Sequence, residues 1–377
     1  MRPSENTDLR FMKLAIQLAK RGLGQTGANP AVGCVIVKKN RIVGRGVTGG
    51  DGRPHAETIA LDQAGNNARN ATVFVTLEPC AHFGVTTPCV DRLIAAGVKR
   101  VVCPLTDPDP RVCGKGFKRL KSEGISLDFI PSAKAWAEDI TSGFLSRTLK
   151  NRPYVTAKLG MSLDGKIATR HGTSKWITNE MARRRVQLLR MQADAILVGT
   201  KTFSIDNPSL NTRGSFSKFR TPLRLFLDRN LSVYPSESIL KNLMKLPSIL
   251  ICGKSPDIEN FKLWESKKIE ILKVPEQKNR LDMKYLLKIL AGKGINSLLI
   301  EGGGELIADL VSNNLIDKLV EYRAGVILGA SGVQSIGELT SAPSKINLYP
   351  KFIIQNMTQL DDNIEITWAP SRNLADS

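Results

Sequence analysis

Residues 71–89 read ATVFVTLEPCAHFGVTTPC, a short β-branched apolar run that leads directly into a Pro-Cys pair. A run of this kind, bounded by turn residues, predicts a buried strand over 71–77. The same pattern recurs on either side of it, at 31–37 and 98–103, and helix-like stretches lie between the runs at 55–64 and 88–96. Strands that alternate with helices indicate an α/β sheet with helices packed on it.

The polar residues around this run are of the types that bind catalytic zinc. His55, Cys80 and Cys89 are zinc ligands by residue type, and three protein ligands leave a fourth tetrahedral position for water. Zinc lowers the pKa of that water to about 7, and the resulting hydroxide can attack an amine-bearing ring carbon. Glu57 follows the histidine by two positions, where it can move protons from the water to the ring and to the departing ammonia. His-x-Glu followed by Pro-Cys is typical of zinc deaminases that act on nitrogen heterocycles.

The local context supports these roles. His55 and Glu57 open a helix after a turn at 49–54 that is rich in glycine and proline. Cys80 follows the strand through Glu78 and Pro79, where we expect a helix N-terminus whose N–H groups favour a thiolate. The same residues also permit a closed structural zinc site, as in a binding module without enzymatic activity, or unrelated buried side chains. Glu57 argues against a structural site, because such a site needs no proton shuttle.

The composition restricts the class of protein. The 377 residues suffice for two domains, and the charged fraction of 24% is ordinary for a globular chain. No apolar run reaches the roughly 18 residues of a membrane span, and residues 8–20 have the spacing of an amphipathic helix rather than of a signal peptide. The six cysteines are therefore expected to be free thiols or metal ligands in a reducing cytosol. The net charge of +19 is shared between residues 1–150 (+9) and the remainder (+10), which favours a generally basic surface or an anionic substrate over a nucleic-acid groove.

A second α/β unit is expected after residues 151–153, Asn-Arg-Pro, where the pattern breaks and we place the domain boundary. A strand at 297–301 runs into Glu-Gly-Gly-Gly at 301–304 and then into a helix at 305–314. Glycines at such a junction let backbone amides approach a phosphate, but the spacing is not that of a Rossmann motif and an ordinary tight turn also explains it. The other strands expected in this half lie at 153–160, 195–199, 223–228, 248–252 and 269–274, with a helix at 179–193.

The long segment between Cys80 and Cys89 carries a resemblance to a known family. Residues 76–84, together with Thr86 and 88–89, resemble the deaminase domain of the bifunctional deaminase-reductase family of riboflavin biosynthesis. Most zinc deaminases instead space the two cysteines as Cys-x-x-Cys. Further matching motifs lie at 29–34, 54–57 and 107–108, and the reductase-like motifs are Lys158, 162–166, 174–178, 206–208 with Leu210 and Arg213, and 301–304. Together they span about residues 9–330, with a weaker tail.

The resemblance implies both a fold and a function. The fold is a cytidine-deaminase-like α/β/α domain over 1–150, followed by a dihydrofolate-reductase-like α/β domain over 151–370. The first domain would use zinc to remove the ring amino group of 2,5-diamino-6-ribosylamino-4(3H)-pyrimidinone 5′-phosphate as ammonia. The second would use NADPH to reduce the ribosyl chain, giving 5-amino-6-ribitylamino-uracil 5′-phosphate. The resemblance also implies a cytoplasmic homodimer with no nucleic-acid or membrane partner, and the choice of NADPH over NADH rests on it alone.

Individual roles follow from the same resemblance. Asn29 and His82 would contact the pyrimidine in the deaminase. Lys158 and Glu301 would handle protons near the ribose C1′ in the reductase. Arg190 and Arg213 suit the 5′-phosphate because guanidinium binds phosphate bidentately. The residues expected to face the nicotinamide cofactor are Gly160, Trp176, Thr202, Asp206, Gly303 and Gly304, and those expected to face the substrate are Ser174, Arg190, Leu210, Arg213 and Glu301.

Four positions in the deaminase half depart from the family pattern. Thr48 stands where histidine is common, Val85 where arginine is common, Thr87 where proline is usual and Asp109 where asparagine is usual. These changes leave the metal ligands untouched and bear on substrate contacts. Two alternatives therefore stay open: a family member with only one active domain, and a nucleic-acid base deaminase with a basic second domain.

Overall fold

The computed structural model describes residues 5–84, 86–214, 220–340 and 343–371. They form two compact units. The first holds the chain up to Pro153 together with Gly294–Asn296, and the second holds Tyr154–Lys293 and the chain from Ser297 onward.

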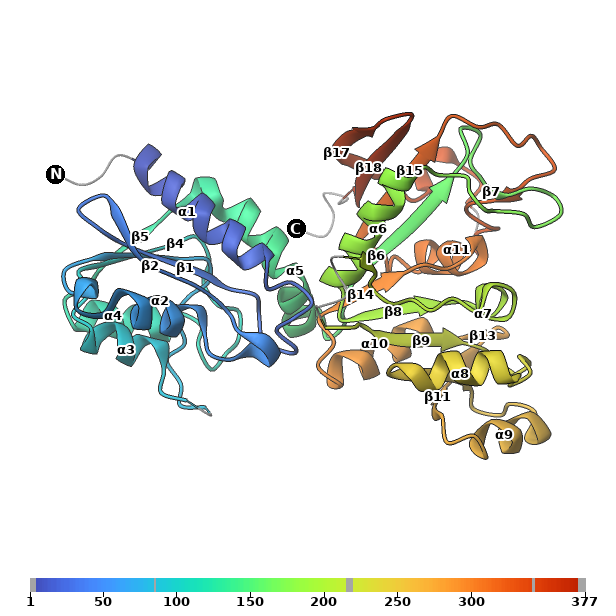
Figure 1. Cartoon of the computed structure of the whole chain (residues 1–377), viewed down its shortest axis with the longest axis horizontal. Helices are drawn as coiled ribbons and strands as arrows, with labels where there is room; N and C mark the ends of the chain where they lie inside the picture. The colour runs from blue at the N-terminus through green and yellow to red at the C-terminus, as the bar shows by residue number, and fades with distance from the viewer. Residues whose placement is uncertain (1–4, 85, 215–219, 341–342, 372–377) are drawn as a thin grey trace. The chain divides into compact units, whose positions relative to one another are not determined.

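A five-stranded sheet forms the middle layer of the first unit (Figure 1). The strand order is β2-β1-β3-β4-β5, in which β1 is antiparallel to both β2 and β3, and β3, β4 and β5 run parallel to one another. The strands are β1 (Gly33–Lys38), β2 (Arg41–Val47), β3 (Thr72–Val75), β4 (Arg100–Cys103) and β5 (Ser126–Phe129).

Helices cover both faces of this sheet because alternate side chains of each strand point to opposite sides. Val35 and Val37 of β1 pack with α1 and the start of α5, whereas Cys34 and Ile36 pack with α2, α3 and α4. The result is an α/β/α sandwich. The helices are α1 (Glu5–Lys20), α2 (Ala56–Ala64), α3 (Cys89–Ala95), α4 (Lys115–Ser122) and α5 (Lys134–Lys150).

Two glycines of β2 allow α2 to lie directly on the sheet. A Cβ on Gly46 would stand 2.0 Å from the carbonyl oxygen of Ala56, and a Cβ on Gly44 would stand 2.1 Å from that of Ala60. This close approach fixes the N-terminus of α2, and with it His55 and Glu57, against the sheet.

A nine-stranded sheet forms the second unit, in the order β11-β10-β9-β8-β14-β6-β15-β18-β17 (Figure 1). The strands from β11 to β15 are parallel, and β18 and β17 are antiparallel additions at one edge. The strands are β6 (Tyr154–Met161), β8 (Ala195–Val198), β9 (Leu223–Leu227), β10 (Ser248–Gly253), β11 (Glu270–Val274), β14 (Ser297–Ile300), β15 (Lys318–Ala324), β17 (Phe352–Leu360) and β18 (Asn363–Pro370). The helices are α6 (Glu180–Gln192), α7 (Thr200–Asp206), α8 (Glu237–Lys245), α9 (Ile258–Glu265), α10 (Met283–Gly292) and α11 (Gly304–Ser312), and two further strand pairs join β7 (Lys166–Ala168) to β16 (Val333–Gln334) and β12 (Glu276–Gln277) to β13 (Arg280–Leu281).

The strands and helices predicted from the apolar runs are present in both units. The sequence pattern missed β2, α4 and β5 in the first unit and β15, β17 and β18 in the second. β17 and β18 lie at the edge of their sheet and expose much of their surface, so their sequences lack the continuous apolar character of buried parallel strands. Within the described ranges, no helix has the length and apolar character needed to span a bilayer.

Candidate active sites

Three potential metal ligands meet where α2, the loop after β3 and α3 come together. His55 is the N-cap residue of α2, Cys89 is the first residue of α3, and Cys80 lies in the loop between β3 and α3. The Nδ1 atom of His55 is 3.2 Å from the Sγ atom of Cys89 and 3.6 Å from that of Cys80, and the three ligand atoms all lie within 4.8 Å of one another. Two thiols and an imidazole nitrogen facing one point form a donor set that suits zinc.

One detail of the predicted context is wrong. Cys80 does not stand at a helix N-terminus, because residues 78–81 form irregular backbone and the next helix begins only at Cys89. The helix start still supports a thiolate, but through the other cysteine: the backbone N–H of Cys89 donates to the sulfur of Cys80 over 3.3 Å. Hydrogen bonds from the Cys89 thiol and from His55 lower the pKa of Cys80 to about 4, against the opposing effect of burial.

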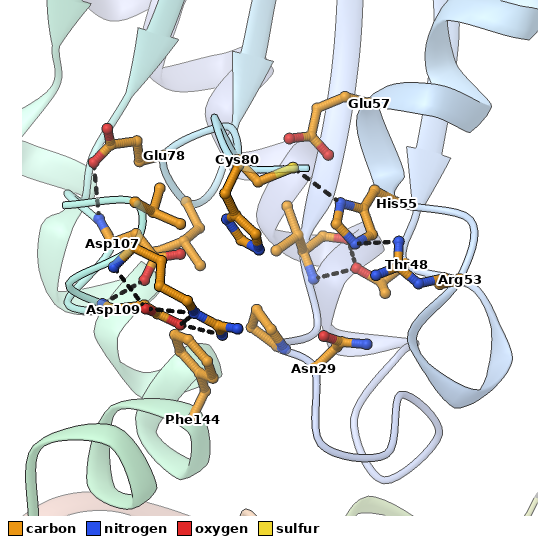
Figure 2. A pocket seen from close by; sticks show the side chains of 16 residues that line it. Asn29, Thr48, Arg53, His55, Glu57, Glu78, Cys80, Asp107, Asp109 and Phe144 are labelled. Carbon is orange, nitrogen blue, oxygen red and sulfur yellow. Dashed lines mark hydrogen bonds and ion pairs between the residues drawn. The ribbon is translucent and has the colours of Figure 1, made fainter. Parts of the chain in front are cut away.

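Glu57 lies in the first turn of α2 and is 4% exposed. Figure 2 shows Glu57, Cys80 and His55 grouped at one end of a pocket, with Asn29 and Phe144 at the other. Burial, followed by the negative charge at Cys80, raises the pKa of Glu57 to about 7. A carboxyl group with a pKa near neutrality can both accept and return a proton, as a general acid–base catalyst must.

The two predicted pyrimidine contacts, Asn29 and His82, both line this pocket. The Nδ2 atom of Asn29 is 3.5 Å from the carbonyl oxygen of Gly52, and a Cβ on Gly52 would stand 1.9 Å from it, so only glycine leaves room for this amide. The Nδ1 atom of His82 is buried and has no hydrogen-bond partner among the described residues. Buried polar atoms are nearly always paired, so His82 presents an atom that a ligand in the pocket could satisfy.

Two of the residues that depart from the family pattern, Thr48 and Asp109, line the same pocket, and Thr87 does not. Thr48 is buried and its hydroxyl bonds both backbone groups of Val32, which makes it part of the pocket wall. Asp109 accepts a forked hydrogen bond from Arg111, whose guanidinium also lines the pocket. Val85 lies outside the described residues.

Glu78 has a structural role that the sequence reasoning did not assign. Its buried carboxylate accepts hydrogen bonds from the backbone N–H groups of Asp107, Gly114 and Phe117, over 3.1, 2.9 and 3.2 Å. These contacts hold the loop that carries Asp107 and Asp109 against the metal-binding loop. The Glu-Pro-Cys motif was a signal for this role, because an acidic residue between a buried strand and a metal ligand needs partners.

We predict that Glu78→Gln will lower the free energy of unfolding by about 1–3 kcal/mol. Glutamine keeps one acceptor oxygen, but its NH₂ group then faces backbone N–H donors and leaves them unsatisfied. Urea unfolding of the full-length protein, monitored through the loss of deaminase activity, measures this change in free energy. A change below about 0.5 kcal/mol would show that these contacts do not hold the loop.

In the second unit, parallel strand ends bring three predicted residues together. Glu301 directly follows β14, and its N–H donates to the carbonyl of Leu197 at the end of β8. Ile300 is paired with Ala157 of β6, so the next residues, Glu301 and Lys158, lie side by side at the carboxyl end of the sheet. The Nζ atom of Lys158 is 3.8 Å from Oε2 of Glu301.

Arg190 of α6 completes this charged cluster. Its Nε and Nη2 atoms donate to the two carboxylate oxygens of Glu301 over 2.6 and 2.9 Å, and its Nη1 donates to the carbonyl of Asn211 over 3.1 Å. Burial acts to raise the pKa of Glu301, but the charges of Arg190 and Lys158 outweigh it and lower the pKa. Glu301 is therefore an ionised carboxylate held between two cations.

The remaining predicted residues fall into two groups. Leu210 and Arg213 lie on the loop after α7; Leu210 is buried, and exposed Arg213 donates through Nη2 to the hydroxyl of Ser209. Trp176 is 70% exposed under the guanidinium of Arg183, so it is not a core residue. The others lie at strand ends, helix ends or turns: Gly160 on β6, Ser174 in a turn before α6, Thr202 and Asp206 on α7, Gly303 as the N-cap of α11 and Gly304 as its first residue.

Comparison with known proteins matches each of the two units to a family model. The family model of the cytidine and deoxycytidylate deaminase zinc-binding region matches residues 5–105, and that of the RibD C-terminal domain matches residues 153–364. The riboflavin biosynthesis protein RibD of Escherichia coli is 40% identical over 334 residues, covering 86% of this chain and 89% of that protein. The protein of the same name from Haemophilus influenzae is 38% identical over 376 residues, covering 96% and 97%.

Solved structures give the same result. RibD of Acinetobacter baumannii is 35% identical, with a TM-score of 0.85 over 98% of this chain and 100% of that one. A Thermotoga maritima protein, described as a diaminohydroxyphosphoribosylaminopyrimidine deaminase/5-amino-6-(5-phosphoribosylamino)uracil reductase, is 31% identical, with a TM-score of 0.84 over the same shares.

These matches confirm the predicted fold class, a cytidine-deaminase-like domain followed by a RibD reductase domain. They also extend the resemblance past residue 330, to residue 364. The match of the second unit to a reductase domain removes the alternative of a nucleic-acid base deaminase. The chain belongs to the RibD family, and it is a bifunctional enzyme of riboflavin biosynthesis that joins a zinc-dependent deaminase to an NADPH-dependent reductase.

Proposed function

We propose that the named residues carry two successive reactions on one phosphorylated pyrimidine. The first is hydrolytic deamination of 2,5-diamino-6-ribosylamino-4(3H)-pyrimidinone 5′-phosphate. The second is reduction of its ribosyl chain to 5-amino-6-ribitylamino-uracil 5′-phosphate. The observation that carries the proposal is the meeting of His55, Cys80 and Cys89 beside the buried carboxyl of Glu57.

In the deaminase, His55, Cys80 and Cys89 would hold zinc, which would supply hydroxide at neutral pH. Glu57 accepts one proton from the attacking water and passes it to the ring nitrogen, then takes the second proton from the added hydroxyl group and gives it to the departing amine. Its pKa of about 7 suits both directions of transfer. Asn29 and His82 hold the pyrimidine over the zinc site, and the unpaired Nδ1 atom of His82 supports this role.

In the reductase, bound NADPH would supply the hydride for the ribose C1′. Lys158 delivers the proton that the ring oxygen takes up when the sugar opens, and the ion pair with Glu301 holds Lys158 in place. Arg213 binds the 5′-phosphate, since its guanidinium is exposed. Arg190 pairs with Glu301 and faces the substrate as well, because Nη1 and Nη2 each keep a second N–H group beyond the bonds they make to the protein. Ser174 and Leu210 complete the substrate side, and Gly160, Trp176, Thr202, Asp206, Gly303 and Gly304 face the cofactor.

Three further parts of the proposal concern organisation. Residues 1–150 act as the deaminase domain and 151–370 as the reductase domain. The enzyme works in the cytoplasm as a homodimer. Exposed apolar residues on the edge strand β17, among them Ile353, Ile354 and Met357, support a partner surface there.

Loss of zinc is the expected result of changing a single ligand. We predict that Cys89→Ser will lower bound zinc well below the roughly one ion per chain of the wild type, because serine is a poor zinc ligand. Cys103→Ser is the matched control: Cys103 is buried outside the cluster, and its thiol donates to the carbonyl of Leu105, as a serine hydroxyl also can. Metal analysis of both purified variants measures the difference. Full zinc in Cys89→Ser would exclude this cysteine as a ligand.

Two assays on one protein sample test the proposal as a whole. Ammonia release from the diaminopyrimidine substrate should proceed without NADPH and stop after zinc is removed by a chelator. NADPH oxidation with the deaminated substrate should continue in the chelated protein. Ammonia release that survives complete zinc removal would contradict the assignment of the first reaction.

A further inference from the structure

The second unit contains a buried arginine that has no carboxylate partner among the described residues. Arg224 is on β9 and is fully buried. Its Nη2 atom donates to the carbonyl oxygens of Asn242, Leu243 and Leu246 and to the hydroxyl of Ser248, over 2.6–3.1 Å. Among the described residues, no carboxylate forms an ion pair with it.

The end of α8 compensates the charge of this arginine. The carbonyl groups that Arg224 binds belong to the last turn of α8 and the residue after it, where unpaired carbonyl oxygens carry the negative end of the helix dipole. The guanidinium thereby fixes the C-terminal end of α8 against the sheet. Asn242, on the same turn, is fixed as well, because its Oδ1 atom accepts from Nη1 of Arg224 over 2.8 Å.

The amide nitrogen of the Asn242 side chain binds the loop that follows α7. Its Nδ2 atom is within hydrogen-bond distance of the carbonyl and Oδ1 oxygens of Asn207, at 3.1 and 2.7 Å, and of the carbonyl of Pro208, at 3.1 Å. Arg224 reaches the next residue, donating through Nη1 to the carbonyl of Ser209 over 3.1 Å. Two side chains, Arg224 and Asn242, therefore hold three consecutive residues of the loop.

The far side of this loop is tied to the charged cluster of the reductase. Arg190, which forms an ion pair with Glu301, also donates to the carbonyl of Asn211. The backbone N–H of Arg213 donates to the side-chain oxygen of Gln187 on α6. Leu210 is buried between these two anchor points. Residues 207–211 of the loop are thus held by contacts to both α8 and α6, and Arg213, whose exposed guanidinium is proposed to bind phosphate, lies two residues further along the chain.

From this geometry we infer that Asn242 is a positioning residue of the reductase: through Asn207 and Pro208 it sets the loop that presents Leu210 and Arg213 to the substrate. The inference rests on the proposed reductase function. It assigns to Asn242 no contact with substrate or cofactor, and no part in the deaminase.

Asn242→Asp separates positioning from stability. An aspartate still accepts from Arg224, and it adds the counter-charge that Arg224 lacks. The aspartate cannot donate a hydrogen bond to Asn207 or Pro208. Its second carboxylate oxygen instead repels the oxygen atoms of these two residues. We expect the reductase KM for the deaminated substrate to rise about tenfold, with kcat within about twofold of the wild type. The variant loses binding energy that acts equally on the substrate and on the transition state. The melting temperature should match or exceed that of the wild type, and the deaminase KM should not change.

Asn260→Asp is the matched control, since it makes the same substitution on α9, away from the loop. It should leave both KM values unchanged. A residue that merely supports the fold would lower the melting temperature without raising KM. If the wild type is active and Asn242→Asp has a normal reductase KM, the inference about Asn242 is overturned while the proposed function stands.

A wild-type protein that reduces no substrate would overturn the proposed function, and the inference with it. If Asn242→Asp does not fold, Asn242→Ser replaces it, because a hydroxyl can retain at most one of the donated bonds. Hydrogen exchange of the full-length variant should then be faster in residues 207–213, together with a raised KM. Unchanged exchange and KM would overturn the inference.

Discussion

Replacing Glu57 with glutamine is expected to lower the deaminase kcat by roughly 10²- to 10⁴-fold, the usual contribution of a general acid–base group. Glutamine keeps the size of the side chain but can neither accept nor return the proton. Glu57 is not among the metal-ligand atoms, so zinc content should stay at the wild-type level. The reductase, measured on already deaminated substrate, should be unaffected. The initial rate of ammonia release at saturating diaminopyrimidine substrate, measured without NADPH, gives kcat.

Glu123→Gln is the control for this substitution, because Glu123 is an exposed residue at the end of α4. It should leave kcat unchanged. A Glu57→Gln enzyme that keeps more than about a tenth of the wild-type rate, with zinc bound, would remove Glu57 from the proton-transfer role.

Glu301→Gln is expected to damage the second unit in two ways. The neutral side chain leaves the partly buried cations Arg190 and Lys158 without their counter-charge, which costs about 1–3 kcal/mol of unfolding free energy. Reductase kcat/KM should fall about 100-fold or more, because Lys158 loses the ion-pair partner that positions it for proton transfer. The pKa of Glu301 is lowered in the fold, so this stabilisation is present above the unfolded pKa of about 4.3 and is lost as the pH falls through the folded pKa.

Thermal unfolding at pH 7 and NADPH oxidation measure these two effects. Glu305→Gln is a suitable control, since Glu305 is nearby on α11 and its ion pair with Lys201 is exposed to solvent. Ammonia release should persist in both variants. If Glu301→Gln kept both wild-type stability and wild-type reductase activity, the charged cluster would have neither of its assigned roles.

The metal site could be predicted from the sequence because its chemistry depends on few residue types at short spacing. His55 and Glu57 are two positions apart, and Cys80 lies in the loop that follows the buried strand β3, so their convergence needs only local structure. The predicted helix start at Cys80 was wrong because residues 78–82 form irregular backbone and the next helix begins at Cys89. Such loop geometry has no signature in apolar periodicity.

The supporting contacts could not be predicted in the same way. Glu78 and Arg224 each bind backbone groups that lie 15–39 residues away in the sequence, and only the fold brings these groups within reach. Resemblance suggested Arg190 as a substrate ligand, and the structure adds its ion pair with Glu301, which the sequence could not show. Residue type identified the charge of Arg190, but the partner of that charge depends on the neighbouring strands.

The order of the two reactions is the central claim, and the masses of the products test it most directly. The purified protein would be incubated with the diaminopyrimidine ribosyl-phosphate, first without NADPH and then with it. We predict a product in which oxygen replaces one amino group, followed after NADPH is added by a gain of two hydrogen atoms. A zinc-loaded protein that yields neither change, or that reduces the sugar while the amino group remains, would contradict the account.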